Sequence, residues 1–376
     1  MKIYYIANAR MPTEKAHGIQ LAKMCEAFVA AGLDLELVLP SRKNTLTSIE
    51  EFYGLNHKIP IKKLPVIDVF NFGRFGFIVG SFSFMAASFL YLLKKRLSGE
   101  KMTLYTIDMD NFSYLWLPLL FTPFFVELHN IKTRNFRNSF CLKRARGIIA
   151  VNNIIREKLI KYFEFAPEKV ITHPNGIDIE KFNEIPDKNE ARKKLGLPLR
   201  KKIALYVGRF YDWKGLEIFS TVSLKEPISL FVVGGTKSEL EKIIGSDLPK
   251  NIICAGACGY QQVPTWLAAA DLLVAVGTKN NPYSYYHTSP MKLFEYMAAR
   301  RPILAAKTPA ICQIVSDEEA SFYAPDDSED LSSMIETVIA DSDTAEIKVQ
   351  KAHEKMQKFS WDNRAGDIIK FVNSNI

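Results

Sequence analysis

The sequence has few cysteines, and none of them are spaced for a metal or redox site. Its five cysteines are an odd number, and only Cys254 and Cys258 lie close together, with three residues between them. Zinc ribbons and redox motifs usually place two residues between paired cysteines. We therefore expect reduced cysteines and a cytoplasmic chain.

Several other signals are missing. No Gly-x-Gly-x-x-Gly follows the first strand-like run, KIYYIANA, which argues against a dinucleotide-dependent enzyme. The opening MKIYYIANAR lacks the apolar region and small-residue cleavage site of a secretory leader, so we expect none. No nucleic-acid reader motif is present either, and we expect no nucleic-acid partner.

One long uncharged and apolar run covers Phe75–Leu93 and is followed by Lys94, Lys95 and Arg96. Its length is just enough to cross a bilayer. It contains two glycines and three serines, so we expect a buried or membrane-facing helix rather than a span. A helix lying on the membrane would place its basic end on anionic lipid.

The whole chain has a net charge of +8, and its excess of positive charge lies in the first part. Residues 1–150 carry 20 Lys and Arg against 11 Asp and Glu, and the remainder carries 29 against 30. A basic half of this kind can bind nucleic acid, anionic lipid headgroups or phosphorylated substrates.

Short β-rich runs alternate with helical stretches throughout the 376 residues. After a polar stretch from Phe182 to Arg200 the alternation restarts with KKIALYVGR. This pattern predicts an α/β fold of two doubly wound parallel-sheet domains. Because such sheets bind ligands beyond the carboxyl ends of their strands, two facing domains would form a binding cleft.

The stretch YVGRFYDWKGLE, from Tyr206 to Glu217, reads as a strand, a short loop and a helix start. Gly208 permits close backbone approach, and Arg209 and Lys214 would both reach a phosphate at the strand end. The alternative is two solvated cations on a loop.

The stretch TSPMKLFEYMAARRP reads as a helix over Pro290–Ala299, capped by Ser289. Lys292 then lies in the first turn, where the helix dipole disfavours a cation. A phosphate at this end would remove the penalty, and Glu295 one turn deeper could accept hydrogen bonds from a ribose diol. The alternative is a salt-bridged surface helix. Together the two stretches predict a nucleotide-sugar site.

These two stretches resemble the GT-B glycosyltransferases of family four, the glycosyl transferases group 1, which retain anomeric configuration. PTEKAHGIQLAKMCEAF, VELHN, PNGIDIEKF and FSWDNRA resemble the family's other landmarks in the same order. The resemblance implies an acceptor domain over 1–181 and a donor domain over 182–360. It also implies that helix 361–376 crosses back onto the first domain.

Site residues follow from the resemblance. It implies donor-binding roles for Gly18, Gly208, Arg209, Lys214, Gly235, Tyr260, Ser289, Lys292 and Glu295. It implies acceptor-side roles for His17, Asp108 and Glu127. His129, Arg209 and Lys214 would lie nearest the chemistry, and Gly18 would lie in a turn that approaches the diphosphate.

Two positions depart from the family pattern. His287 stands where many members carry a glutamate, eight residues before Glu295, and Arg300 stands where a glycine usually ends the helix. If Arg300 is left-handed, the cost is on the order of 1 kcal/mol. Ser289 and Lys292 would do work related to that of the missing glutamate.

We therefore expect a metal-free, cofactor-free retaining glycosyltransferase that uses a UDP- or GDP-linked sugar. Asp108–Asp110 mimics a metal-binding Asp-x-Asp, but it follows a first-domain strand, and we expect no metal there. The acceptor would be a lipid-linked or cell-envelope glycan, with peripheral contact to the inner face of the membrane. A non-catalytic scaffold with the same fold remains the alternative.

Overall fold

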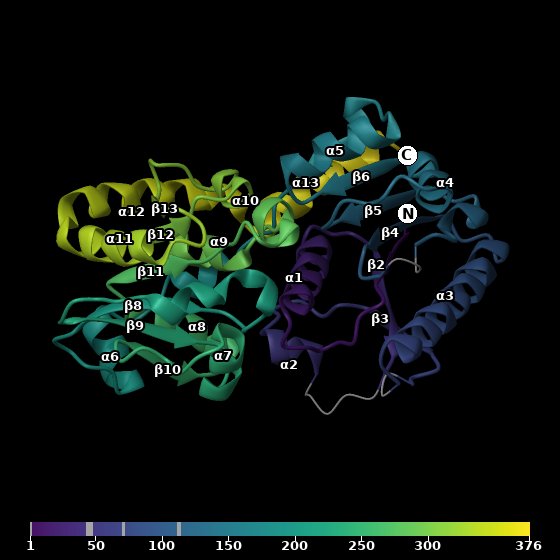
Figure 1. Ribbon diagram of the computed structural model, residues 1–376. Helices are drawn as coiled ribbons and strands as arrows, with labels where there is room; N and C mark the ends of the chain where they lie inside the picture. Colours follow the sequence, from purple (N-terminus) through teal and green to yellow (C-terminus); the bar gives the residue numbers. More distant parts are fainter. Residues whose placement is uncertain (1, 43–47, 70–71, 111–113) are drawn as a thin grey trace. The chain divides into compact units, whose positions relative to one another are not determined.

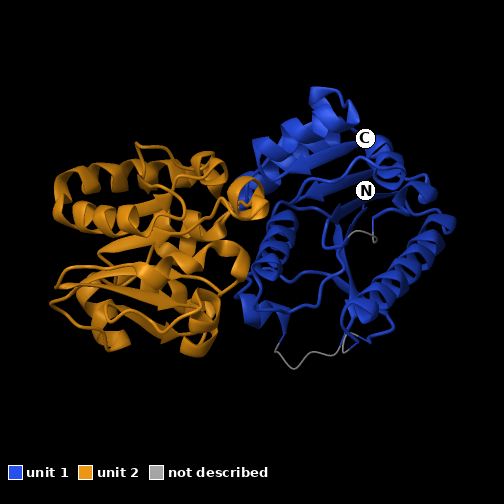
Figure 2. Cartoon of the chain, in the orientation of Figure 1, with its two compact units in different colours: residues 1–175, 361–376 blue, residues 176–360 orange. Residues whose placement is uncertain are grey.

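The computed structural model describes residues 2–42, 48–69, 72–110 and 114–376. The chain divides into two compact units, one comprising residues 1–175 and 361–376 and the other residues 176–360 (Figure 2). The sequence placed the boundary at 181/182. It lies earlier because Ile177 forms a β-bridge with Ser360 and donates its backbone N–H to the Phe359 carbonyl, so this segment belongs to the second unit.

Unit 1 is built on a seven-stranded parallel sheet in the order β3-β2-β1-β4-β5-β6-β7 (Figure 1). Its strands are β1 (Lys2–Ile6), β2 (Leu35–Ser41), β3 (Ile61–Pro65), β4 (Met102–Ile107), β5 (Phe124–Leu128), β6 (Gly147–Ala150) and β7 (Val170–Thr172). Its helices are α1 (Ala16–Ala30), α2 (Ile49–Tyr53), α3 (Gly73–Leu97), η2 (Leu117–Leu120), α4 (Phe136–Arg144), α5 (Asn153–Phe163), η3 (Pro167–Lys169) and α13 (Trp361–Ser374).

Alternating strand residues of unit 1 face two helix layers. Tyr5 and Tyr105 pack edge-on at 4.7 Å and both contact Phe28 of α1. On the same strands the intervening residues join a second cluster with side chains of α3, α4 and α5. Helix α13 adds Phe371, whose ring lies 6.0 Å from that of Phe125. The sheet is therefore covered on both sides, as parallel sheets require.

Helix α3 confirms that the long uncharged run is helical. By length and composition it is the one helix in the described part of the chain that could cross a membrane, and 33% of its most apolar window is buried.

Unit 2 repeats the plan with a six-stranded parallel sheet in the order β10-β9-β8-β11-β12-β13. Its strands are β8 (Lys202–Val207), β9 (Ile228–Val233), β10 (Ile252–Gly256), β11 (Leu272–Ala275), β12 (Ile303–Ala306) and β13 (Ser321–Tyr323). Its helices are η4 (Ile179–Phe182), α6 (Lys188–Leu195), η5 (Asp212–Lys214), η6 (Leu216–Thr221), α7 (Lys237–Ile244), η7 (Tyr260–Gln262), α8 (Val263–Ala268), the π-helix η8 (Tyr283–His287), α9 (Met291–Ala298), α10 (Pro309–Cys312), α11 (Ser328–Ala340), α12 (Ser342–Met356) and η9 (Gln357–Phe359).

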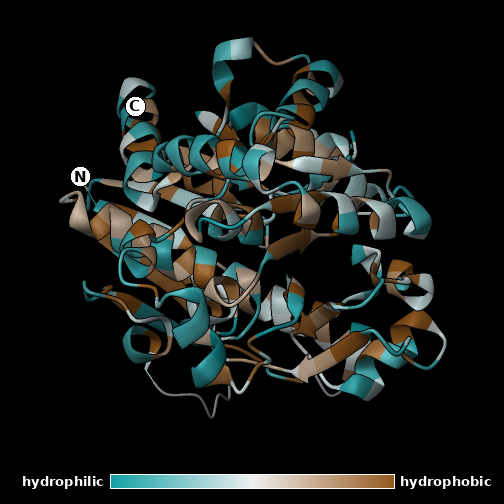
Figure 3. Cartoon of the chain, turned by 90° about the vertical axis from the view of Figure 1, so that its left-hand side faces the viewer, coloured by the Kyte–Doolittle hydropathy of each residue, from teal (hydrophilic) through white to brown (hydrophobic). Residues whose placement is uncertain are grey.

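The polar stretch 182–200 folds as part of unit 2. Helix α6 is capped by Asp187 and tied to the sheet because buried Arg192 donates to Asp271 at 2.6 Å. The helices carry bands of both polar and apolar residues (Figure 3), which is typical of elements buried on one side.

The two strand orders are the same, with the first strand of each unit between its second and fourth. The order reverses between β1 and β4 in unit 1 and between β8 and β11 in unit 2. Loops that leave the carboxyl ends of these strands diverge and leave room for a ligand.

Candidate functional site

The predicted cations of unit 2 lie at the strand-order reversal. Gly208 and Arg209 follow β8 directly, and Thr278 lies in the loop after β11. Glycine is required here, since a Cβ on Gly215 would come within 2.7 Å of the Thr278 Cβ. The Arg209–Gly215 loop is thus packed against the neighbouring strand's loop.

Two glycines with positive φ allow the strand ends to approach each other. Gly208 has φ +152°, and a Cβ there would lie 2.8 Å from the Lys292 Nζ. Gly234 has φ +145°, and a Cβ there would collide with the Gly208 carbonyl oxygen. At Gly235, which the resemblance assigns to donor binding, the missing Cβ makes room for the Phe210 ring. The close backbone approach therefore belongs to Gly208 and Gly234.

Three lysines of unit 2 have their ammonium groups close to aromatic rings. The Lys292 Nζ lies 3.8 Å from the centre of the Tyr206 ring. Lys214 lies 5.0 Å from Tyr211 and 5.5 Å from Trp213, and it donates to the Arg209 carbonyl at 2.9 Å.

The third lysine is Lys181, whose Nζ lies 4.4 Å from the Tyr260 ring and 3.7 Å from Asp178. A ring face holds a cation in place but leaves its charge unneutralised, whereas a carboxylate would neutralise the charge. For Lys214 and Lys292, this arrangement leaves the positive charge available to an anion.

Lys292 is the most exceptional of these groups. Its Nζ is buried and makes no hydrogen bond with any described residue. Burial lowers the pKa of Lys292 well below its usual value, and the charge of Lys214 lowers it further. An uncompensated buried ammonium is unfavourable, so the site is built for a negatively charged ligand.

Helix α9 begins one residue later than predicted. Its N-cap is Pro290, which has no side-chain acceptor, and Ser289 is buried before it. The prediction that Ser289 caps the helix is therefore wrong, because the cap position has moved to the proline.

Glu295 lies one turn beyond Lys292 on α9 and is buried in the same cluster. Burial raises the pKa of Glu295 to about 7, although the charges of Lys292 and Lys181 oppose the shift. Burial also raises the pKa of Tyr260, with the charge of Glu295 adding to the effect. The structure thus brings the predicted lysines, Glu295 and Tyr260 together.

A buried tyrosine fixes α9 relative to the sheet. The Tyr296 hydroxyl accepts from the Val207 N–H at 3.1 Å and donates to the Val274 carbonyl at 3.3 Å. Because these two residues lie on β8 and β11, Tyr296 holds Lys292 and Glu295 at the reversal point.

His287 ends the π-helix η8, three residues before the N-cap of α9. Tyr283 of η8 packs edge-on against Trp213 at 5.0 Å, and Trp213 stacks on Tyr211 at 5.9 Å. π-Helices occur frequently at functional sites. The segment with the unexpected histidine is therefore connected to the loop that carries Lys214.

In unit 1, Glu127 is a fully buried hub rather than an acceptor contact. Its carboxylate accepts from His129 Nε2 at 2.7 Å, Gln20 Nε2 at 3.0 Å, the Tyr105 hydroxyl at 2.6 Å and Arg364 Nη2 at 2.8 Å. Its side chain has no exposed surface, so the acceptor-side prediction for Glu127 is wrong. Burial raises the pKa of Glu127, but Arg364 and the hydrogen bonds outweigh it and lower the pKa.

His129 is the partly exposed end of this network. The backbone N–H of His129 donates to Asp108 Oδ1 at 2.9 Å, and Asp108 Oδ2 forms an ion pair with Lys132 Nζ at 2.9 Å. Asp108 is therefore committed to holding the His129 loop. His17 lies nearby, where burial and the charges of Lys15 and His129 lower its pKa to about 4.

Gly18 does not lie in a turn, contrary to prediction. It is the third residue of α1 and is buried. A Cβ at Gly18 would collide with the Tyr53 hydroxyl and the Thr13 side chain, so the glycine is needed for packing.

Sequence analysis missed Arg364, Lys181, Tyr206 and Gly234. The first two lie in FSWDNRA and PNGIDIEKF, stretches that had been recognised without assigning roles to these residues. Nothing in the sequence indicates that a ring or carboxylate from a distant segment meets them.

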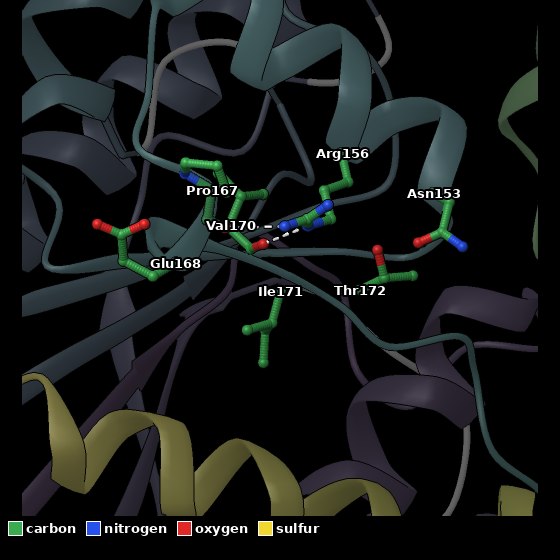
Figure 4. Close-up of a pocket in the computed structure, with 7 residues that line it drawn as sticks. All are labelled: Asn153, Arg156, Pro167, Glu168, Val170, Ile171 and Thr172. Carbon is green, nitrogen blue, oxygen red and sulfur yellow. Dashed lines mark hydrogen bonds between the residues drawn. The ribbon is translucent and has the colours of Figure 1, made fainter.

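A surface hollow in unit 1 contains none of the predicted residues (Figure 4). It is lined by Asn153, Arg156, Pro167, Glu168, Val170, Ile171 and Thr172. Arg156 donates to the carbonyls of Val170 at 2.6 Å and Pro167 at 2.9 Å, so its guanidinium is used in fixing the loop before β7. Across residues 2–42, 48–69, 72–110 and 114–376 there is no cluster of three His, Cys, Asp or Glu that could hold a metal.

Residues 187–356 match the sequence model of the glycosyl transferases group 1. The chain is 28% identical over 217 residues to the lipopolysaccharide core biosynthesis mannosyltransferase LpsB of Rhizobium meliloti, covering 54% of this chain and 57% of LpsB. It is 27% identical over 195 residues to the sulfoquinovosyl transferase SQD2 of Arabidopsis thaliana, covering 50% and 36%. The chain thus spans about half the length of the curated relatives it matches.

Solved structures show the same fold over the whole chain. Sucrose-phosphate synthase from Thermosynechococcus elongatus superposes with a TM-score of 0.79 at 18% identity, covering 99% of this chain and 98% of that one. Anabaena Alr3699/HepE, in complex with UDP and glucose, superposes with a TM-score of 0.74 at 18% identity and full coverage of both. The architecture is the GT-B fold, and residues 187–356, in the second unit, match the glycosyl transferases group 1.

Proposed function

We propose that this protein is a metal-independent retaining glycosyltransferase that moves a hexosyl group from a nucleotide diphosphate to an acceptor. The donor would bind in unit 2 at the reversal between β8 and β11. Support comes from the family match over residues 187–356 and from the cluster of cations around Lys292.

The observation that carries the proposal is the Lys292 ammonium, which is buried beside Lys214 and makes no hydrogen bond with any described residue. A diphosphate supplies the negative charge that this pair lacks, and Arg209 lies on the same loop as Lys214. Glu295, one turn deeper, would accept the ribose hydroxyls. The cations and the carboxylate thus suit two neighbouring parts of a nucleotide sugar, the diphosphate and the ribose.

During transfer, the bond between the anomeric carbon and the diphosphate oxygen breaks while a bond to an acceptor oxygen forms. The acceptor's proton passes to the leaving phosphate oxygen. Negative charge grows on the diphosphate, and Lys214, Lys292 and Arg209 would stabilise it where a metal ion acts in other enzymes. His129 would orient the acceptor in unit 1, held by Glu127 and Asp108.

We infer that the acceptor is a lipid-linked or cell-envelope glycan, used at the inner face of the membrane. The relative LpsB is named for lipopolysaccharide core biosynthesis. The excess of basic residues over 1–150 suits an acceptor carried by an anionic surface.

Calorimetric titration with UDP and GDP tests the donor site. We expect one nucleotide to bind the wild type, and Lys214→Ala to weaken that binding at least tenfold. Lys193→Ala on α6 is the matched control, because this lysine is exposed and distant in sequence from the cluster. If neither nucleotide binds, the scaffold alternative raised by His287 replaces the proposal.

Measuring enzymatic turnover further distinguishes a glycosyltransferase from a non-catalytic scaffold. Hydrolysis or transfer from the preferred UDP- or GDP-sugar should be lost in Lys214→Ala and kept in Lys193→Ala. Tight nucleotide binding with no transfer to any glycan acceptor would favour a binding protein.

A further inference from the structure

Helix α3 of unit 1 buries mostly small residues and exposes a stripe of large apolar residues. Its buried positions are Gly76, Gly80, Ser81, Phe84, Ser88 and Leu92. Its exposed positions include Phe75, Phe82, Leu90 and Leu97, which are 70%, 46%, 63% and 78% exposed. These four lie seven, eight and seven residues apart, so they form one stripe along the helix.

This arrangement is the reverse of an ordinary surface helix. Burying a leucine or phenylalanine stabilises a fold by about 2 kcal/mol, whereas Phe75, Leu90 and Leu97 of α3 stay mostly exposed. The inner side packs closely because glycine and serine take little space. The outer stripe is therefore suited to a partner outside the chain.

Neighbouring elements extend the stripe into a surface. Helix α3 packs against η2, and η2 packs against α4. Leu119 of η2, Phe121 just after η2, and Phe136 of α4 are 53%, 83% and 84% exposed. The Arg96 guanidinium lies 5.6 Å from the Phe121 ring, which joins α3 to the segment just after η2.

Charge on this surface has one sign. Helices α3, η2 and α4 contain seven lysines and arginines and no aspartate or glutamate. Lys94 and Arg96 are exposed at the end of the stripe, whereas Lys95 pairs with Glu100 at 3.3 Å. A surface that is both apolar and basic matches the headgroup region of an anionic bilayer.

We propose that unit 1 docks on an anionic lipid bilayer through α3, η2 and α4, with α3 lying in the plane of the interface. The apolar stripe enters the headgroup and acyl boundary, and Lys94 and Arg96 contact lipid phosphates. A crossing helix would have to leave the core, because Phe84 and Leu92 are fully buried in unit 1. A second copy of the chain is disfavoured, since a symmetric pair would oppose like charges.

The docked surface connects to the sheet of unit 1. Ser81 on the inner side of α3 accepts a hydrogen bond from Asn8 Nδ2 at 3.1 Å, just after β1. Membrane docking would thus bring the carboxyl ends of these strands close to the bilayer. That this serves a lipid-linked acceptor rests on the proposed function, whereas the docking itself does not.

Vesicle co-sedimentation of the full chain tests the docking. We expect strong binding to phosphatidylcholine vesicles containing 30% phosphatidylglycerol and weak binding to pure phosphatidylcholine. Lys94→Gln with Arg96→Gln should reduce partitioning about 30-fold at low salt. Leu90→Gln with Leu97→Gln should reduce it about tenfold or more.

Matched controls lie on unit 2. Lys193→Gln with Lys194→Gln removes two exposed cations from α6, and Ile347→Gln removes an exposed apolar side chain from α12, 61% exposed. Both controls should bind anionic vesicles as the wild type does. All variants should keep the wild type's melting temperature and nucleotide affinity, so a failure of docking is distinguishable from a failure of the proposed function.

Three results would overturn the proposal. The first is equal recovery of the wild type with neutral and anionic vesicles, or no recovery with either. The second is an equal loss in the controls on unit 2. The third is a wild-type dimer in light scattering that Leu90→Gln with Leu97→Gln converts to a monomer, which would assign the stripe to a second copy.

Discussion

Arg364 and Glu127 lie 237 positions apart in the sequence and form an ion pair of 2.8 Å inside unit 1, with both side chains at most 1% exposed. Arg364 comes from α13, the helix that follows all of unit 2 in the chain. The same carboxylate holds His129, so the position of that histidine depends on the C-terminal helix being docked.

Breaking this ion pair should destabilise unit 1 strongly. Arg364→Met leaves Glu127 buried without its cation, which typically costs about 3–5 kcal/mol. Lys370→Met on the same helix is the control, because Lys370 is 81% exposed. Urea unfolding should show the loss only in Arg364→Met, and equal midpoints for the two variants would contradict the finding.

A double variant separates charge from packing. Adding Glu127→Gln to Arg364→Met should recover part of the lost stability, because a neutral amide is less costly to bury than an unpaired carboxylate. Independent, additive losses would show that the two residues do not depend on each other.

Removing the charge of Lys292 should separate stability from binding. Lys292→Met keeps the length of the side chain and its contact with the Tyr206 ring, but it removes a buried ammonium. We expect the free protein to gain on the order of 1 kcal/mol, since the desolvation penalty disappears. Nucleotide affinity should fall at least tenfold in the same variant.

Thermal melting checks the expected gain in stability, and calorimetry checks the expected loss of nucleotide affinity. Lys193→Met serves as a control, and both its melting temperature and its nucleotide affinity should remain near the wild-type values. A lower melting temperature in Lys292→Met would mean that Lys292 stabilises the fold, and the inference of an anion site would lose its main support.

Nucleotide binding should be strongest between about pH 7 and pH 8. Glu295 has its pKa raised to about 7 by burial, and it accepts ribose hydroxyls best when ionised. Lys214 has its pKa lowered to about 8 by burial and by Arg209, and it attracts a diphosphate only when protonated. Affinity should therefore fall by up to tenfold per pH unit on either side.

One variant tests each side of this dependence of nucleotide affinity on pH. Glu295→Gln should flatten the acid limb alone, and Lys214→Met the alkaline limb alone, as measured by titration from pH 5.5 to 9.5. A profile unchanged by either substitution would mean that neither group meets the nucleotide.

The same carboxyl predicts a pH dependence of stability. Because the pKa of Glu295 is raised above 4.5 in the folded chain, the fold holds a proton that the unfolded chain has released. The free energy of unfolding should fall by about 3 kcal/mol as pH rises from 4.5 to 7. Glu295→Gln should remove this fall relative to the wild type in urea unfolding at matched pH.

Arg300 is left-handed, with φ 52°, as expected if it takes the place of a helix-ending glycine. Arg300→Gly should stabilise unit 2 by about 1 kcal/mol, less the exposed hydrogen bond to His353 at 2.9 Å. Lys193→Gly, inside α6, should instead destabilise by about 1 kcal/mol. Thermal melting of the two variants should move in opposite directions.

The sequence by itself determined the two doubly wound sheets, because buried parallel strands need uninterrupted apolar runs, and such runs can be recognised in the amino-acid sequence. KIYYIANA contains β1 and KKIALYVGR contains β8, the first strand of each sheet. Strands β3, β7 and β13 all lie at sheet edges, where IKKLP, VIT and SFY are short and partly exposed. An edge strand buries less of each side chain, so its sequence carries a weaker signal.

The candidate site divides in the same way. Lys214, Lys292 and Glu295 were identifiable because each lies at a strand end or in the first turns of a helix, positions that local sequence marks. Only the tertiary structure decided that Tyr206 lies under Lys292, that Gly234 rather than Gly235 makes the close approach, and that Glu127 is buried beneath Arg364. These are contacts between segments tens to hundreds of residues apart, and their free energy depends on distances that no stretch of sequence specifies.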